Sequence, residues 1–144
     1  MPTLDTLTIT IGASPTLDEA LTLYGEVGWA SYLRDPERLR RALGGSLLVA
    51  TARDGDQLVG LARVVGDGAS IIYLQDVLVH PQYRRLGLGR RLVESVFGPY
   101  SNVYQQVLIT DAEPEQIGFY QSLGFTELRD FPNDGLRGFL RFPD

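Results

Sequence analysis

The sequence contains no cysteine, no lysine and a single histidine, His80. Without cysteine, the chain has no residue for a disulfide, a thiolate nucleophile or a cysteine-ligated zinc site. A single histidine also excludes a metal site built from several histidines, so we expect no metal. All 13 basic residues are arginine. The phosphate-binding P-loop, which needs a lysine after its second glycine, is therefore excluded as well.

The sequence also lacks a long apolar run and an excess of positive charge. No apolar stretch approaches the ~20 residues that span a bilayer, and residues 1–10 have neither the basic head nor the apolar core of a signal peptide. We therefore expect a cytoplasmic protein with no membrane partner. The formal net charge of −5 and the pI near 4.8 argue against a nucleic-acid partner, which needs a broad basic surface. The 144 residues, 44% of them hydrophobic, predict one globular domain over 1–144.

What the sequence does contain is an apolar strand, a glycine loop rich in arginine, and an amphipathic helix, in that order. The strand is expected over residues 71–79, and His80-Pro81 ends it because proline lacks the N–H that a sheet requires. The loop reads Arg84-Arg85-Leu86-Gly87-Leu88-Gly89-Arg90-Arg91. Apolar residues then recur at helical spacing, which predicts a helix that begins near Gly89.

This loop indicates an anion site. The first N–H groups of a helix have no intrahelical partner, and the positive end of the helix dipole favours a phosphate. The positive charges of Arg90 and Arg91 are unfavourable beside the positive end of that dipole. A bound anion would make their placement favourable. A solvated arginine face after a tight turn is the alternative, and spacing alone leaves it open. A dinucleotide fingerprint fits poorly, because Leu92 stands where its third glycine would be.

The remaining segments predict a single α+β domain. Alternating or apolar runs bounded by turn residues predict strands over residues 4–11, 46–51, 57–65, 71–79 and 103–110, and a final hairpin of 126–129 with 136–142 around Asn133-Asp134-Gly135. Helical spacing with capping residues predicts helices that begin near Leu17, Pro36 and Pro114, besides the helix after the glycine loop.

Two motifs resemble those of the GCN5-related N-acetyltransferase (GNAT) superfamily. Val77-Leu78-Val79-His80-Pro81, followed by Arg84-x-x-Gly87-x-Gly89, is similar to the acetyl-CoA loop of that superfamily. The later Gly118-Phe119-Tyr120-Gln121-Ser122-Leu123-Gly124-Phe125 is similar to its Phe-Tyr-x-x-Leu-Gly-Phe helix end. The resemblance implies a GNAT-like α+β fold, with a mixed, mostly antiparallel sheet of six or seven strands and helices on both faces.

The resemblance also implies how acetyl-CoA is bound and used. Its pyrophosphate is expected on the backbone amides from Arg85 to Arg90, and its pantetheine arm along the free backbone groups of the preceding strand. The expected cofactor-binding residues are Val77, Leu78, Val79, Arg84, Arg85, Leu86, Gly87, Leu88, Gly89 and Arg90. Tyr120 matches the tyrosine that protonates the departing coenzyme A thiolate in this superfamily. A core tyrosine on an apolar helix face is the alternative.

Gln75-Asp76 interrupts the apolar strand and needs an explanation. A β-bulge that turns one of the two to solvent is the structural explanation. The resemblance to polyamine acetyltransferases, in which acidic residues at this place contact the amine, predicts instead a catalytic Asp76 that faces the acceptor. Trp29 and Tyr32 are either core residues or a wall of the acceptor pocket.

Together these features predict an enzyme that moves an acetyl group from acetyl-CoA to a small primary amine or polyamine. The amine is expected to attack directly, since the chain has no cysteine to carry an acyl group. Acetylation of a protein N-terminus and a non-catalytic acyl-CoA sensor are the alternatives. The sequence leaves a homodimer open.

Overall fold

The computed structural model describes residues 2–143. The chain divides into two compact units, Met1–Leu108 and Ile109–Asp144. Met1 and Asp144, the two ends of the domain expected over 1–144, lie outside the described residues. The single domain stays a prediction.

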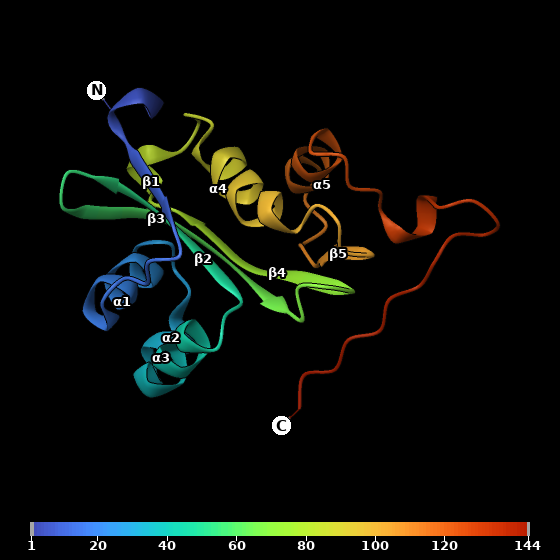
Figure 1. Cartoon of the computed structure of the whole chain (residues 1–144), viewed down its shortest axis with the longest axis horizontal. Helices are drawn as coiled ribbons and strands as arrows, with labels where there is room; N and C mark the ends of the chain where they lie inside the picture. The colour runs from blue at the N-terminus through green and yellow to red at the C-terminus, as the bar shows by residue number, and fades with distance from the viewer. Residues whose placement is uncertain (1, 144) are drawn as a thin grey trace. The chain divides into compact units, whose positions relative to one another are not determined.

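The first unit is built on a five-stranded sheet with the strand order β1-β2-β3-β4-β5 (Figure 1). Its strands are β1 (Thr8–Ile11), β2 (Leu48–Asp54), β3 (Gln57–Gly66), β4 (Ile71–Val79) and β5 (Gln105–Leu108). Neighbours from β1 to β4 pair antiparallel, whereas β5 joins β4 in parallel. The mixed, mostly antiparallel sheet expected from the sequence is therefore confirmed.

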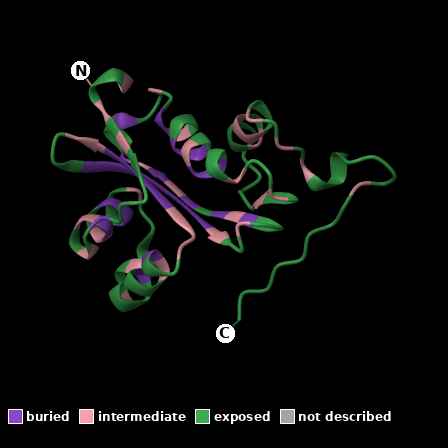
Figure 2. Ribbon diagram, viewed as in Figure 1, coloured by how far each residue is buried: buried purple, intermediate pink, exposed green. Residues whose placement is uncertain are grey.

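Helices cover both faces of this sheet, as expected. The helices α1 (Leu17–Glu26), α2 (Ala30–Leu33) and α3 (Pro36–Gly44) lie on one face, and α4 (Leu88–Phe97) lies on the other (Figure 1). Leu23 of α1 and Leu39 of α3 pack with Leu61 and Leu78 of the sheet. On the opposite face, a Cβ at Gly60 would lie 2.9 Å from Leu92 of α4, so glycine there lets α4 pack closely. Figure 2 shows the buried residues gathered along the central strands.

The helix starts follow the capping residues in the sequence. Thr16 accepts a hydrogen bond from the Glu19 N–H (3.2 Å), and the Glu19 side chain accepts one from the Thr16 N–H (3.0 Å), so a capping box begins α1. Asp35 caps α3 by accepting from the Arg38 N–H at 3.2 Å, with Pro36 in the first helical position. Such caps satisfy amides that the helix itself leaves without partners. The predictions for Leu17 and Pro36 are confirmed.

The second unit contains α5 (Pro114–Ser122) and a short 3-10 helix, Leu128–Asp130. Pro114 occupies the first position of α5, as predicted. The helix ends at Ser122 with Leu123 as its C-cap. Gly124 follows with a positive φ of 94°, and the Phe125 N–H donates to the Tyr120 carbonyl at 3.1 Å. This is the pattern in which a left-handed glycine terminates a helix.

The expected C-terminal hairpin is wrong, and with it the count of six or seven strands. Asn133 and Asp134 do adopt the left-handed conformation of a turn, with φ of 61° and 69°. One backbone bond crosses this turn, from the Leu136 N–H to the Leu128 carbonyl (2.6 Å). Residues 128–130 coil into a 3-10 helix, so no ladder of bonds follows. An isolated pair of strands is marginally stable without a third strand or a helix against it.

The other differences are smaller. Residues 4–6 form the 3-10 helix Leu4–Thr6 rather than the start of a strand, and further 3-10 turns lie at Pro81–Tyr83 and Gly98–Tyr100.

Among the described residues, no helix has both the length and the apolar character needed to cross a membrane.

Candidate functional site

The second half of β4 has an open edge on the side of β5. Strand β5 pairs only with residues 71–74 of β4, and in the described part of the first unit no strand pairs with residues 75–79 on that side. On the other side, the His80 N–H donates to the Val59 carbonyl of β3 at 2.8 Å. Backbone groups alternate in direction along an antiparallel strand. Those of Val77 and Val79 therefore point away from β3, toward the open edge.

The same alternation corrects the expectation for Leu78. Leu78 is the register partner of Leu61 on β3, and its N–H and carbonyl point toward that strand. Its backbone is already used inside the sheet, so it cannot serve an extended ligand in the way first expected. Val77 and Val79 retain the N–H and carbonyl groups that such a ligand would pair with.

The glycine loop that follows β4 gathers amides at the N-terminus of α4. Arg85 has a φ of 65° and Gly87 a φ of 84°, so two left-handed residues precede the helix. Gly87 is the N-cap, and its carbonyl accepts the Arg91 N–H at 3.2 Å. The helix thus begins at Leu88, one residue before the predicted Gly89. Alternating left- and right-handed residues turn successive N–H groups toward one side, an arrangement that binds anions.

The arginines around this loop are exposed. Arg84, Arg85, Arg90 and Arg91 all lie on the surface. The Arg90 side chain donates to Glu94, one helical turn further on, with Nε 3.1 Å from Oε1. Arg84, Arg85 and Arg91 add positive charge around the helix N-terminus, where it attracts an anion.

A short connection fixes this loop relative to the open edge of β4. The His80 Nδ1 accepts a hydrogen bond from the Gln82 N–H at 3.1 Å, and the His80 ring packs edge-on against Tyr83 with ring centres 5.6 Å apart. The Tyr83 hydroxyl in turn donates to Asp54 Oδ2 of β2 at 2.5 Å. His80 therefore positions the loop.

Asp76 lies in a buried cluster on the α1 face of the sheet. The register between β3 and β4 shifts between Arg63 and Val64, and a β-bulge there exposes Gln75 and buries Asp76. The bulge expected from the sequence is confirmed. Oδ2 of Asp76 accepts hydrogen bonds from Arg63 Nε (2.6 Å), the Tyr24 hydroxyl (2.7 Å) and, more weakly, the Tyr32 hydroxyl (3.5 Å).

Arg63 connects this cluster to the neighbouring helices. Its Nη2 donates to the Tyr32 hydroxyl of α2 at 3.0 Å, and its Nη1 reaches the Ala42 carbonyl of α3 at 3.5 Å and Ser46 Oγ at 3.4 Å. Burial lowers the pKa of Arg63, but Asp76 raises it by more, so the guanidinium stays charged. Burial, with Asp76 adding to it, raises the pKa of Tyr24 well above its usual range. Tyr24 is therefore a protonated donor.

These contacts bear on the role predicted for Asp76. Its charge is matched by a guanidinium that is as buried as the carboxylate itself, and the hydrogen bonds from Arg63, Tyr24 and Tyr32 all fall on Oδ2. Direct contact between Asp76 and a substrate amine stays a prediction. The geometry favours a positioning role, in which Asp76 holds Tyr24 and Tyr32 in place.

Trp29 and Tyr32 prove to be neither wholly core nor wholly surface. Tyr24 lies between them, with ring centres 5.8 Å from Trp29 and 4.9 Å from Tyr32, both edge-on. Trp29 is 38% exposed and Tyr32 is half-buried. We call Tyr24, Trp29 and Tyr32 the aromatic wall. It is partly open to solvent beside Asp76.

Tyr120 lies in the second unit, on α5. Its side chain is half-buried against Phe119 and Phe125, with ring centres 5.0 and 6.1 Å away. Burial raises the pKa of Tyr120, and the charge of Asp111 contributes. A phenol with a raised pKa keeps its proton at neutral pH, which a general acid requires. The catalytic role of Tyr120 stays a prediction.

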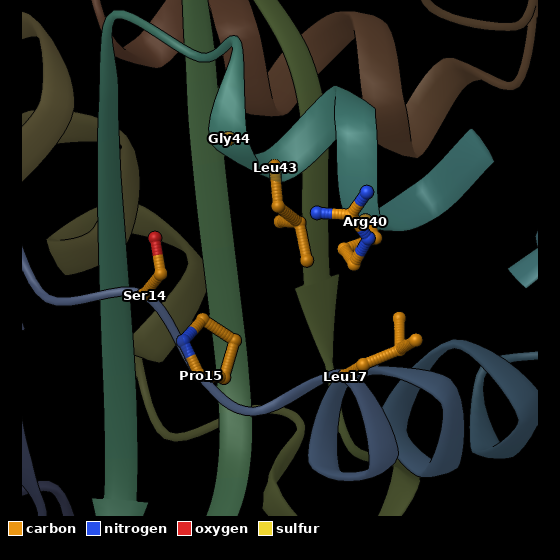
Figure 3. A pocket seen from close by; sticks show the side chains of 6 residues that line it. All are labelled: Ser14, Pro15, Leu17, Arg40, Leu43 and Gly44. Carbon is orange, nitrogen blue, oxygen red and sulfur yellow. The ribbon is translucent and has the colours of Figure 1, made fainter. Parts of the chain in front are cut away.

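A separate shallow hollow lies between the segment before α1 and helix α3 (Figure 3). It is lined by Ser14, Pro15, Leu17, Arg40, Leu43 and Gly44. Arg40 is paired with Glu37 on its own helix. None of the predicted site residues lines this hollow, and we assign it no function. Among the described residues, no cluster of histidines and carboxylates is suited to hold a metal ion.

Sequence reasoning missed the central role of Arg63. The available signal was an arginine within the otherwise apolar strand 58–65, next to a strand interrupted by an acidic residue. Unpaired charges are costly inside a sheet, so a buried arginine and a buried aspartate on consecutive strands predict a pair. The register that joins them depends on the bulge, and that was not predictable to one residue.

Known proteins resemble this chain over most of its length. A family model described as "Acetyltransferase (GNAT) domain" matches residues 18–139. An "Uncharacterized N-acetyltransferase ycf52-like" of Prochlorococcus marinus is 34% identical over 128 residues, which cover 85% of this chain and 70% of that protein. "Serotonin N-acetyltransferase 2, chloroplastic" of Oryza sativa subsp. japonica is 35% identical over 109 residues, 73% of this chain and 52% of that protein. A solved GNAT-family acetyltransferase of Streptococcus pneumoniae TIGR4 superposes with a TM-score of 0.80 at 38% identity, covering 94% of this chain and 99% of that one.

Proposed function

Because the chain belongs to the GNAT family of N-acetyltransferases, we propose that it transfers an acetyl group from acetyl-CoA to the primary amine of a small molecule. One observation carries this proposal. The open edge of β4 at Val77 and Val79 leads, through the loop fixed by His80, into the amides at the N-terminus of α4. A ligand with an amide-bearing arm joined to a pyrophosphate suits such a surface, and coenzyme A has that chemistry.

The residues present fit this cosubstrate. The pantetheine amides would pair with the outward backbone groups of Val77 and Val79, as when an extended peptide adds to a sheet edge. The pyrophosphate would lie on the amides from Arg85 to Arg90 at the positive end of α4. Gly87 leaves this approach open, since a Cβ there would meet nothing nearer than Leu4 Cδ2 at 3.9 Å.

The chain's own groups would assist the transfer at two points. When bound, acetyl-CoA supplies an activated acetyl group that the amine attacks directly. The acetyl group would lie at the end of the pantetheine arm away from the loop, where the outward N–H of Val77 would donate a hydrogen bond to the acetyl oxygen, on which negative charge develops. The Val77 carbonyl and the Val79 groups would remain for the pantetheine amides. As the carbon–sulfur bond breaks, Tyr120 would donate its phenolic proton to the departing sulfur, and the nitrogen that forms the new amide bond would release a proton to water, from which Tyr120 is reprotonated. General acid catalysis of this kind contributes roughly 10²–10⁴-fold.

Two observations support a small amine as the acceptor. The partly open aromatic wall offers a surface of side-chain size beside β4. The rice relative is named for serotonin, which is a small primary amine. A polyamine remains within this proposal.

Calorimetry with acetyl-CoA, followed by a thiol-release assay over a panel of amines, tests the proposal. We expect acetyl-CoA to bind and thiol to appear when a small primary amine is added. An absence of binding at millimolar acetyl-CoA would contradict the proposal. Binding without thiol release for any amine would favour the acyl-CoA sensor, and release only with peptides that carry a free N-terminus would favour the protein N-terminal acetyltransferase.

A further inference from the structure

We propose that the acceptor is a monoamine with an aromatic body and that polyamines are poor substrates. This inference rests on the acetyl transfer proposed above and narrows its acceptor. It follows from two features of one cluster. Arg63 cancels the charge of Asp76. The aromatic wall is joined to that pair by the hydroxyls of Tyr24 and Tyr32, and Trp29 packs against Tyr24.

The first feature removes the attraction that a polyamine would need. A polyamine carries several positive charges, and the ammonium groups that do not react need carboxylates to receive them. Asp76 is the one buried carboxylate among the described residues. Its Oδ2 already accepts from Arg63 Nε at 2.6 Å, so the pair offers no net negative charge. A second cation brought to this place would meet the guanidinium as well as the carboxylate.

A second carboxylate, that of Glu26 at the end of α1, lies near the end of β4. Its side chain is half exposed, and its Oε2 lies 3.8 Å from Nε2 of His80. Water screens an exposed carboxylate of this kind, so its attraction for a distal ammonium is weak. Glu26 therefore does not replace the charge that Arg63 cancels at Asp76.

The second feature favours an aromatic body. Trp29 exposes 38% of its surface, and Tyr24 packs edge-on against its ring. The Tyr32 hydroxyl is held by Arg63 Nη2 at 3.0 Å, which fixes the ring it belongs to. Fixed aromatic side chains that remain partly open bind another aromatic ring by stacking or edge contact, with little loss of side-chain freedom on binding.

The aromatic wall also lies near the open edge of β4. Asp76 directly precedes Val77, the first residue whose backbone points to the open edge of β4. A ligand whose ring rests on the wall therefore lies close to the edge where the acetyl group is expected. One short linker between ring and nitrogen is enough to bring the amine there.

The test compares tryptamine, phenethylamine, putrescine and spermidine by kcat/KM at saturating acetyl-CoA. The variants are Trp29→Ala, Trp29→Phe and, as a matched exposed aromatic, Tyr104→Ala. Tyr104 is 89% exposed and precedes β5, at the end of β4 away from Val79. We expect wild type to prefer the aromatic amines at least tenfold. Trp29→Ala should lose that preference through a higher KM for the aromatic amines, Trp29→Phe should keep most of it, and Tyr104→Ala should match wild type.

Arg63→Gln gives an independent arm, because it uncovers the charge of Asp76. We expect it to raise kcat/KM for spermidine relative to tryptamine, and if this variant fails to fold the Trp29 series decides alone. Turnover that favours spermidine tenfold in wild type, or an equal effect of Trp29→Ala on all four amines, would overturn this inference and leave the proposed acetyl transfer standing. A lack of turnover with every amine would overturn the proposed function and this inference with it.

Discussion

Arg63 Nε on β3 lies 2.6 Å from Asp76 Oδ2 on β4, and both side chains are only 5% exposed. The pair joins the two central strands at the point where β4 bulges, and among its further bonds are those to Tyr24 on α1 and Tyr32 on α2. A single ion pair thus links the sheet to the helices that carry the aromatic wall. Its loss should therefore affect both stability and acceptor binding.

Removing one partner of this pair should be strongly destabilising. Arg63→Met leaves the Asp76 carboxylate buried without its cation, and we expect the free energy of unfolding to fall by about 3–5 kcal/mol in urea titrations. Arg53→Gln is the matched control, because Arg53 pairs with Glu19 at 2.5 Å while both side chains remain about 30% exposed. That pair should contribute about 1 kcal/mol or less. Equal losses in the two variants would contradict the burial argument.

Tyr24 should make the protein sensitive to alkaline pH. Its pKa is raised in the folded state, mainly by burial, so its contribution to stability is fully present below the unfolded-state pKa of about 10 and is lost as pH rises above it. Above that pKa, one such group makes the free energy of unfolding fall by about 1.4 kcal/mol for each pH unit. Tyr24→Phe should be less stable at neutral pH but show a shallower decline above pH 10, measured by urea titration at several pH values. Tyr104→Phe should keep the wild-type slope, and an unchanged slope in Tyr24→Phe would refute this assignment.

Sequence patterns predicted the elements whose signals are local. The apolar strand that ends at His80-Pro81, the glycine loop before α4 and the caps of α1 and α3 depend on residues within one turn of each other. These elements appear where they were expected, with the start of α4 displaced by one residue to Leu88.

Features that depend on distant partners were not predictable in the same way. The hairpin turn at Asn133-Asp134 forms locally, but the strands beside it do not, because a ladder needs further neighbours that the turn itself does not supply. The sequence predicts free backbone groups at Leu78. Because Leu78 pairs with Leu61, however, its N–H and carbonyl point toward β3. The pairing of Asp76 with Arg63, 13 positions away along the chain, was not predictable either, because the two meet only through the bulged register.

The loop before α4 should control acetyl-CoA binding. Gly87→Asp places a negative charge beside the amides proposed to hold the pyrophosphate, and a side chain at φ of 84° also adds strain of roughly 1–2 kcal/mol. We expect the Kd for acetyl-CoA to rise at least tenfold in calorimetry. Gly98→Asp adds the same charge at the other end of α4, where a Cβ would meet nothing within 4 Å. If both variants bind like wild type, the pyrophosphate does not lie on this loop.

Tyr120→Phe should lower kcat without changing the Kd for acetyl-CoA. The substitution removes only the hydroxyl, and the phenylalanine ring keeps the packing against Phe119 and Phe125. Loss of the general acid should reduce kcat by about 10²–10⁴-fold, measured by steady-state thiol release. Tyr104→Phe serves as the control. Wild-type turnover in Tyr120→Phe across the pH range would remove the tyrosine from the mechanism.

The most direct test of the account is to count acetylated amine against free coenzyme A in one reaction. Wild-type protein is incubated with acetyl-CoA and tryptamine, thiol is titrated, and the product is identified by mass spectrometry, with Gly87→Asp and Gly98→Asp in parallel. The account predicts one acetylated amine for each thiol released, no release above background without amine, and loss of the reaction in Gly87→Asp alone. Thiol release that proceeds equally without amine, or acetyl-CoA binding with no acetylated product for any amine, would contradict it.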